Sequence, residues 1–221
     1  MKLVGSVDLI DKSDTALRES LPTMESSVRA AIERVVWPPG APTFTILAEK
    51  DTGRGKGNGV VPIMRSFMDA LGPSQWLREK ILHLPDGATI GRFDAVFPFP
   101  DASFEDGGKR DLKVISGSFG VVEWETGNIS SSHRSLNRMV LGMLHGNVAA
   151  GFLVIPTRSI ARYLTGRVGN VEELSPYFEV YRKIMVERGV LRVLKVEHDA
   201  ASTDASVVPK IRKGTDGRAL Q

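Results

Sequence analysis

Two glutamates spaced two residues apart in a strand-forming run are the feature of this sequence best suited to chemistry. They are Glu123 and Glu125 in the segment GVVEWE, residues 120–125. Because side chains alternate across a β-strand, we expect both carboxylates on one face and Trp124 on the other. Two carboxylates can share a hard cation, since Mg²⁺ prefers oxygen ligands and keeps water at its remaining positions. The spacing indicates a metal site that a carboxylate from a neighbouring strand would complete. Taken alone, the same pattern is more often the solvated face of a half-exposed strand.

The elements that must position these glutamates alternate between strands and helices. The pattern predicts helices over residues 24–37, 62–71, 128–145, 159–164 and 171–181, and strands over residues 43–48, 91–97, 112–115, 119–125, 148–155 and 190–196. Within the helix over 128–145, Leu136, Val140 and Leu144 should form one apolar face. Residues 100–108 are rich in turn formers, and residues 51–59 form a glycine-rich basic loop that matches neither nucleotide-binding glycine pattern. This order predicts an α/β domain.

Composition bounds the class of protein. The chain has 221 residues, 42% of them hydrophobic, which fits a single globular domain over residues 1–221 with a polar tail over about 197–221. The net charge of +3 permits a polyanionic partner. The absence of cysteine excludes disulfides and thiolate-bound zinc and fits a reducing cytoplasm. The longest apolar run, residues 148–156, is too short for a membrane helix, so we expect a cytoplasmic protein with no membrane partner.

The residues that follow the glutamate pair narrow the prediction. Residues 123–137 read EWETGNISSSHRSLN, and this stretch closely resembles the catalytic segment of the BamHI family of type II restriction endonucleases. Matching pieces occur in the same order along the chain: NGVVPI (58–63), WLREK (76–80), YLTGRV (163–168), EEL (172–174), PYFE (176–179) and KGTDG (213–217). Each fragment is weak support alone, but their shared order argues against coincidence. The resemblance implies a restriction-endonuclease-like fold, in which helices flank a central mixed β-sheet, and a bacterial source.

The resemblance also implies catalytic roles. In this family the metal-binding carboxylates come from an aspartate on one strand and the first glutamate of the E-x-E pair, which are Asp94 and Glu123 here. Glu79, in WLREK, matches a further carboxylate near the metal ions. Glu125 matches the residue proposed to orient or deprotonate the attacking water. We therefore expect Mg²⁺-dependent hydrolysis, with Mn²⁺ as a substitute, that gives 5′-phosphate and 3′-hydroxyl ends.

The identity of the aspartate is open to a second interpretation. Asp111 lies 12 residues before Glu123, whereas Asp94 lies 29 residues before it, so spacing alone favours Asp111. The motif context, GRFDAVF, favours Asp94. In that case the additional residues form an insertion around residues 101–110, which a surface loop tolerates. Asp111 is then a turn residue beside Arg110.

Base recognition falls to residues that match family positions facing the major groove: Asn128, Ser130, Arg134, Arg167 and Asp216. Arginine suits guanine O6 and N7, and a carboxylate can accept from cytosine N4. Without the resemblance, Arg134 would be a solvated helix residue and Arg167 a cation at a helix end.

Two departures affect the expected DNA site. The family aspartate immediately before the arginine is Gly166 here, and the lysine after NGVVPI is Met64. The resemblance implies the palindrome GGATCC, cut to leave 5′ overhangs. Losing a carboxylate acceptor leaves one cytosine contact unexplained, so the resemblance does not account for the readout of the outer base pair.

Cutting both strands of a palindrome calls for a two-fold symmetric homodimer. The resemblance supplies candidate dimer contacts at His145 and around Glu179. Leu144 and Arg182 do not reproduce the neighbouring family charge pair, so the contacts can differ. Without the resemblance, His145 and Glu179 would be ordinary surface residues.

Two other functions stay open. The chain can be a sequence-specific DNA-binding protein that no longer cuts, or a metal-dependent hydrolase of small phosphate esters. A pure binder gains nothing from acids beside a phosphate, and the small-substrate enzyme does not explain the recognition residues. The expected partners are therefore double-stranded DNA and a second copy of the chain, with a cognate DNA methyltransferase implied by the biology of the family.

Overall fold

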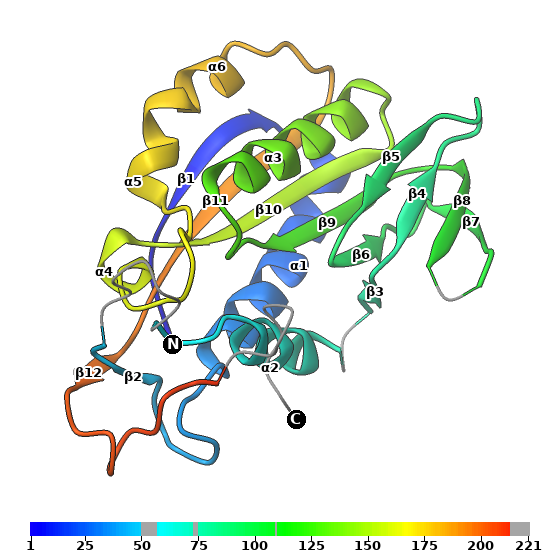
Figure 1. Cartoon of the computed structure of the whole chain (residues 1–221). Helices are drawn as coiled ribbons and strands as arrows, with labels where there is room; N and C mark the ends of the chain where they lie inside the picture. The colour runs from blue at the N-terminus through cyan, green and yellow to red at the C-terminus, as the bar shows by residue number, and fades with distance from the viewer. Residues whose placement is uncertain (50–56, 73–74, 109, 213–221) are drawn as a thin grey trace.

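A six-stranded mixed sheet forms the centre of the computed structural model, which describes residues 1–49, 57–72, 75–108 and 110–212 (Figure 1). Its strands are, in spatial order, β1 (Lys2–Lys12), β11 (Gly189–Glu197), β10 (Val148–Pro156), β9 (Phe119–Trp124), β6 (Ala95–Pro98) and β3 (Leu77–Arg78). Strands β9, β10 and β11 are parallel, whereas β1, β6 and β3 each run antiparallel to their neighbours. The chain therefore has the predicted mixed sheet.

Helices cover both faces of this sheet (Figure 1). One face carries α1 (Thr15–Glu33) and α2 (Val61–Leu71), and the other carries α3 (Ile129–Leu144), α5 (Val171–Leu174), the 3₁₀ helix η1 (Ser175–Tyr177) and α6 (Phe178–Arg182). Helix α4 (Arg158–Ala161) follows β10. Alternation along β10 explains the two layers, because Phe152 packs into the first core and Leu153 into the second.

Two smaller sheets extend from this centre. One has the order β5 (Thr89–Arg92), β4 (Ile81–His83), β8 (Asp111–Ser116) and β7 (Ser103–Asp106); the other pairs β12 (Ala200–Ser202) with β2 (Thr45–Leu47). The pairing of β12 with β2 ties part of the expected polar tail to the body, and Ile211 is fully buried. None of the described helices is long and apolar enough to cross a membrane.

Several predicted elements differ from those observed. The single strand predicted over residues 91–97 is two strands in different sheets, β5 and β6, interrupted at Phe93 and Asp94. The helix predicted over 24–37 begins nine residues earlier, at Thr15, and ends at Glu33. Residues 171–181 contain three short helical segments, and the turn-rich region 100–108 contains β7. Strand β1 was not predicted, because register irregularities after Leu3 and Asp8 interrupt its alternation.

The helices over 62–71 and 128–145 are confirmed to within one residue at each end. One detail of the second helix is wrong: Leu136 and Val140 are buried as expected, but Leu144 is 57% exposed. The apolar face of α3 thus continues past the core to the surface.

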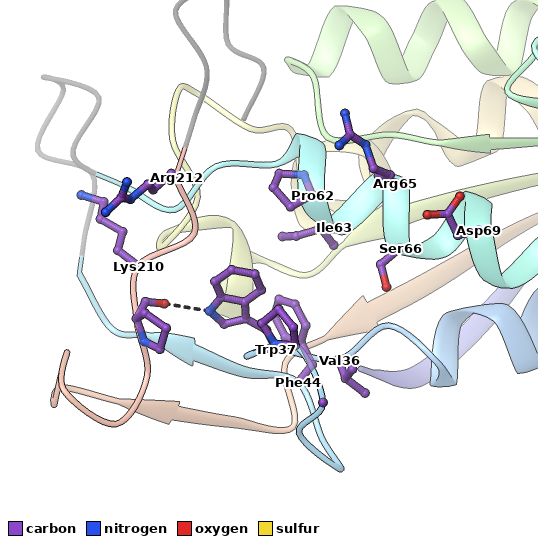
Figure 2. A pocket seen from close by; sticks show the side chains of 13 residues that line it. Val36, Trp37, Phe44, Pro62, Ile63, Arg65, Ser66, Asp69, Lys210 and Arg212 are labelled. Atoms are coloured by element: carbon purple, nitrogen blue, oxygen red, sulfur yellow. Dashed lines mark hydrogen bonds between the residues drawn. The ribbon is translucent and has the colours of Figure 1, made fainter. Parts of the chain in front are cut away.

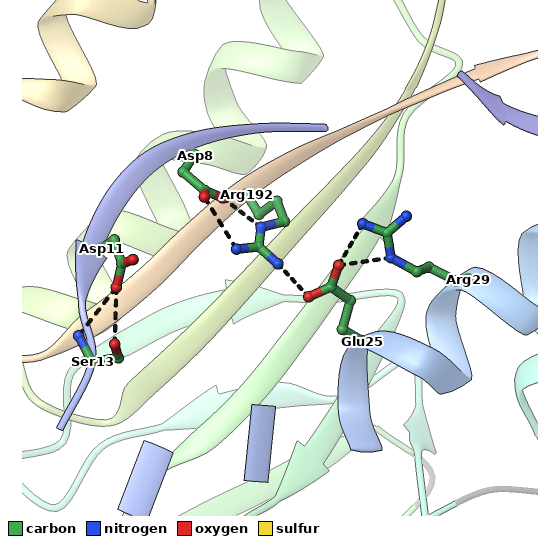
Figure 3. A network of polar contacts seen from close by, with 6 residues as sticks. All are labelled: Asp8, Asp11, Ser13, Glu25, Arg29 and Arg192. Carbon is green, nitrogen blue, oxygen red and sulfur yellow. Dashed lines mark hydrogen bonds and ion pairs between the residues drawn. The ribbon is translucent and has the colours of Figure 1, made fainter. Parts of the chain in front are cut away.

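A polar network joins the outer strands to α1 (Figure 3). The guanidinium of Arg192, on β11, pairs with Asp8 on β1 and with Glu25 on α1. Glu25 also pairs with Arg29 one turn along the helix. The side chains of Arg192 and Glu25 are 16% and 15% exposed, so the centre of the network is shielded from solvent, whereas Asp8 and Arg29 lie at its exposed edges. It ties α1 to β1 and β11, at the edge of the sheet opposite β3.

Candidate active site

The E-x-E pair lies at the end of β9, where the alternation of the strand separates Glu123 from Trp124. Trp124 packs on the α2 side, with its ring centroid 4.7 Å from that of Phe67. Val121, which shares the parity of Glu123, packs into the core beneath α3. Glu123 is only 6% exposed, so the solvated-face interpretation of this glutamate is wrong. Glu125 follows the last residue of β9 and is half-buried.

Asp94 lies immediately before β6, the antiparallel neighbour of β9. Ala95 is paired with Val122, which brings Asp94 beside the end of β9. Its carboxylate Oδ2 accepts a hydrogen bond from the backbone N–H of Trp124 at 2.8 Å. The structure therefore joins Asp94 to the E-x-E segment through a contact that sequence spacing does not reveal.

Asp111 lies elsewhere. It begins β8 in the smaller sheet, and its Oδ1 is 2.9 Å from Nε2 of His83. Residues around 101–110, expected as an insertion, include β7, which pairs with β8. The geometry thus favours Asp94 over Asp111 as the partner of Glu123.

The backbone of Glu79 contacts the backbone of Asp94. Its N–H donates to the carbonyl of Asp94 at 2.7 Å, and its φ of 51° is a left-handed conformation that a side chain seldom adopts. The Glu79 carboxylate is 3.5 Å from Nη2 of Arg110. Glu79 therefore supports Asp94 by its main chain while its own side chain faces a surface cation.

Glu125 is held by two hydrogen bonds. The backbone N–H of Gly127 donates to Oε1 at 2.7 Å, and the hydroxyl of Ser135 donates to Oε2 at 3.3 Å. One partner lies in the turn after β9 and the other on α3. The carboxylate is thus fixed between strand and helix, as a group that orients a water molecule must be.

Sequence reasoning missed Arg138 on α3. Its Nη2 donates to Oε1 of Glu123 at 2.7 Å and to the hydroxyl of Ser135 at 3.2 Å. An arginine in a polar helix position is usually solvated, and nothing in the spacing marks this one. The available signal was its position one turn after Ser135, on the flank of the helix that faces β9.

Burial governs the protonation of the carboxylates. It raises the pKa of Asp94 and Glu125 and raises the pKa of Glu123 well above its usual value. The negative charge of Asp94 raises the pKa of Glu123 further, whereas Arg138 opposes the rise. When ionised, these carboxylates place several negative charges close together in a poorly solvated site. A bound cation would stabilise their ionised forms.

The donor set fits a hard divalent cation. Within residues 1–49, 57–72, 75–108 and 110–212, no three acidic or histidine side chains are already gathered as a metal site. Even so, the negative charge of Asp94 raises the pKa of both Glu123 and Glu125, the charge of Glu125 raises the pKa of Glu123, and all their side-chain donor atoms are oxygens. Glu79 also raises the pKa of Asp94 by its charge. For Glu123 Oε1 to bind an ion, its contact with Arg138 would have to give way.

The N-terminal cap and first two turns of α3 present three of the expected DNA-contacting residues. Asn128 caps the helix, with its side-chain oxygen accepting from the N–H of Ser131 at 3.1 Å. Ser130 and Arg134 are exposed, and Nη2 of Arg134 donates to Ser131 Oγ at 3.3 Å. These polar groups lie just beyond the carboxylates on the same chain segment.

Arg167 lies on a loop that packs against this helix start. The N–H of Gly169 donates to the carbonyl of Gly127 at 2.8 Å. A Cβ at Gly169 would lie 2.9 Å from the backbone of Ile129, so only glycine permits this approach. The structure therefore brings exposed Arg167 and the α3 residues together. Asp216 lies outside the described residues.

His145 lies directly after α3, and Glu179 lies on α6; both helices and the residues next to them carry exposed apolar side chains. His145 follows the end of α3, with Nδ1 4.0 Å from Asp86, and Glu179 pairs with Arg182 and Lys183. The large exposed hydrophobic residues of this region are Leu141, Leu144, Tyr177, Val180 and Met185. An apolar surface of this kind is suited to protein contact.

A separate cavity of about 680 Å³ lies between α2 and residues 209–212 (Figure 2). Trp37 and Phe44 line it, and Nε1 of Trp37 donates to the carbonyl of Pro209 at 2.7 Å. Arg65 and Arg212 add positive charge at its edge. None of the candidate catalytic carboxylates lines it, so it is distinct from the site at β9.

Comparisons with known proteins show the family and the fold of this chain. A family model described as restriction endonuclease BamHI matches residues 1–218. The chain is 38% identical to the type II restriction enzyme OkrAI of Oceanobacter kriegii over 91% of each chain, and 35% identical to BamHI of Bacillus amyloliquefaciens over 87% of this chain and 80% of BamHI. The solved structure of restriction endonuclease BglII with a DNA 16-mer is 12% identical, with a TM-score of 0.57 over 90% of this chain and 79% of that one, which shows a shared fold.

Proposed function

Because this chain belongs to the BamHI family of type II restriction endonucleases, we propose that it hydrolyses both strands of a palindromic DNA duplex in a Mg²⁺-dependent reaction that leaves 5′-phosphate ends. The observation that carries the chemistry is the contact between Asp94 and the E-x-E segment: the half-buried Asp94 carboxylate, directly before β6, accepts a hydrogen bond from Trp124, the residue between the buried Glu123 and Glu125. GGATCC with 5′ overhangs is the first site to test.

Asp94 and Glu123 would hold the metal ion, with Glu79 at its edge. A bound Mg²⁺ supplies charge neutralisation at the scissile phosphate and lowers the pKa of a coordinated water. Mn²⁺, which accepts the same oxygen donors, is the expected substitute.

Glu125 is the candidate to orient the attacking water and accept its proton. Its two carboxylate oxygens are anchored by Gly127 and Ser135, so the group keeps one orientation. Burial raises the pKa of Glu125 despite these hydrogen bonds, which makes its carboxylate a stronger base than an exposed glutamate.

Sequence recognition would come from the exposed polar groups beside this centre: Asn128, Ser130, Arg134 and Arg167, with Asp216 in the terminal segment. Arginine can pair with guanine in the major groove. Gly166, where the family has an aspartate, has no side chain and so offers no carboxylate to accept from cytosine. Met64 packs partly against the core. The readout of the outer base pair must therefore use other groups or be relaxed.

A homodimer would place one catalytic centre on each strand. His145 and Glu179, together with the exposed apolar residues of α3 and α6, are the proposed interface. This pairing would bury surface that is otherwise unfavourably exposed. A cognate methyltransferase would protect host DNA.

Incubation with plasmid DNA and Mg²⁺ tests the proposal. Discrete linear fragments, abolished by EDTA and by Glu123→Ala, are expected. A retarded but uncut plasmid would instead indicate the non-cutting DNA-binding protein. Sequencing the fragment ends would report both the site and the stagger.

A further inference from the structure

Arg138 forms the one ion pair that Glu123 makes within the described part of the chain. The pair joins α3 to β9 at 2.7 Å, with the arginine side chain 24% exposed and the glutamate side chain 8% exposed. Oxygen Oε1 of Glu123, a candidate metal-binding atom, is therefore already engaged by a positive group.

The guanidinium is confined by its surroundings. It lies over the ring of Phe93, 5.6 Å from the centroid, beside Asp94. A Cβ at Gly91, whose φ is 115°, would lie 3.0 Å from Arg138 Cδ, so glycine leaves room for the arginine stem. The end of β5 and Phe93, which follows it, thus accommodate this side chain next to the carboxylates.

The pairing is incomplete on the arginine side. Nε of Arg138 is buried and has no hydrogen-bond partner among the described residues. A purely structural arginine would normally satisfy such a donor, because leaving it unpaired is unfavourable. If Glu123 binds another partner, the guanidinium can therefore reorient and give its unpaired Nε–H a hydrogen-bond acceptor.

We propose that Arg138 is a positioning residue that holds Glu123 as a resident countercharge in the metal-free protein and competes with the divalent ion for that carboxylate. The inference rests on the proposed metal-dependent function. Removing the competition should strengthen metal binding even without DNA. In the wild-type protein, metal binding should release the guanidinium toward the DNA backbone, where phosphate offers a bidentate acceptor.

Mn²⁺ binding to the full-length protein without DNA, followed by electron paramagnetic resonance, tests the competition. Arg138→Met should bind Mn²⁺ about tenfold more tightly than wild type. Arg92→Met is the matched control: Arg92 lowers the pKa of Asp94 and Glu123 by its charge, but no described contact joins it to either carboxylate. A much smaller gain in that variant would show that direct pairing, and not general attraction, matters.

A second measurement follows Arg138 in the wild-type protein, so its main result does not depend on whether Arg138→Met folds. The buried Nε–H of Arg138 should give a slowly exchanging ¹⁵N resonance. Titration with Mg²⁺ should shift this resonance in wild type and leave it unchanged in Glu123→Gln.

Equal or weaker Mn²⁺ binding by Arg138→Met, or an Nε resonance that Mg²⁺ does not move, would overturn the inference. If plasmid cleavage still depends on Mg²⁺ and Glu123 in that case, the nuclease proposal holds and only the role of Arg138 is refuted. Absence of Mn²⁺ binding in every variant, together with uncut plasmid, would overturn both.

Discussion

Asp94 and Trp124 are joined across two antiparallel strands by a hydrogen bond from the backbone N–H of Trp124 to the Asp94 carboxylate. Because Trp124 separates the two glutamates of the E-x-E pair, this bond sets the position of Asp94 relative to both. The site is thus organised around a main-chain donor, whose geometry does not depend on a side-chain rotamer.

Asp94→Asn should lower the rate of DNA cleavage by at least about 100-fold, since losing a metal ligand is no milder than losing one of its supporting partners. Asn keeps the acceptor oxygen for Trp124, so the fold should persist. Asp111→Asn, which alters only the contact with His83, should leave the rate within about twofold of wild type. Single-turnover cleavage distinguishes the two. The reverse ranking would assign the metal-binding aspartate to Asp111.

Glu123→Gln should stabilise the metal-free protein at pH 8 by roughly 1 kcal/mol. Burial raises the pKa of Glu123 above its value in the unfolded chain, so the folded state holds more protons between the two values. Stability therefore falls as pH rises through that interval, and a neutral side chain avoids this loss. The higher stability of the variant should vanish near pH 4, where Glu123 of the wild type is protonated in both the folded and the unfolded state.

Thermal unfolding with and without Mg²⁺ checks the same variant. The ion should stabilise wild type and not Glu123→Gln, which reverses their order. Glu79→Gln, at a half-exposed position, is the control and should change metal-free stability by less than about 0.5 kcal/mol. If Glu123→Gln is less stable than wild type at pH 8, ionised Glu123 does not destabilise the metal-free protein and the prediction is wrong.

Asn128→Asp should separate capping from DNA contact. Aspartate caps a helix as well as asparagine, so stability should hold, whereas the added negative charge beside DNA should weaken binding. Asn128→Ala should lose about 1 kcal/mol of stability as well. Asn170→Ala removes the equivalent cap from α5 and should affect stability alone. Unfolding curves and DNA titrations in Ca²⁺ measure the two effects; unchanged DNA affinity in Asn128→Asp would refute a contact there.

Val180→Asp should convert a dimer to a monomer. Val180 is 61% exposed on α6, within the proposed interface, and a charge there would be buried on association. Val207→Asp, at 66% exposure in the C-terminal segment, is the matched control and should stay dimeric. Sedimentation equilibrium reports the masses. The monomer should also lose coordinated double-strand cleavage; dimers in both variants would move the interface elsewhere.

The sequence predicted the elements whose periodicity is uninterrupted. Strand β9 is a β-prone run and helix α3 carries a pattern with a period of about 3.6, and the opposite orientation of Glu123 and Trp124 followed from the alternation of side chains along any strand. The prediction of one strand over 91–97 was wrong, because Phe93 and Asp94 form the break between two sheets. Local alternation cannot show such a break, which depends on what each half pairs with.

For the same reason, the local sequence pattern could not decide between Asp94 and Asp111. It also could not predict that Arg138 belongs to the site. Each depends on a contact between residues at least 15 positions apart in the chain. The family resemblance supplied Asp94 but gave no indication of Arg138, since no matching motif marked it.

The close approach of Gly169 to the start of α3 has a consequence for engineering. The loop with Arg167 and the helix with Arg134 are locked together by main-chain contact and will shift as one body. Efforts to retarget this enzyme by exchanging one of these segments with a relative's would misalign the other, so productive hybrids should require both segments to be transplanted as a pair.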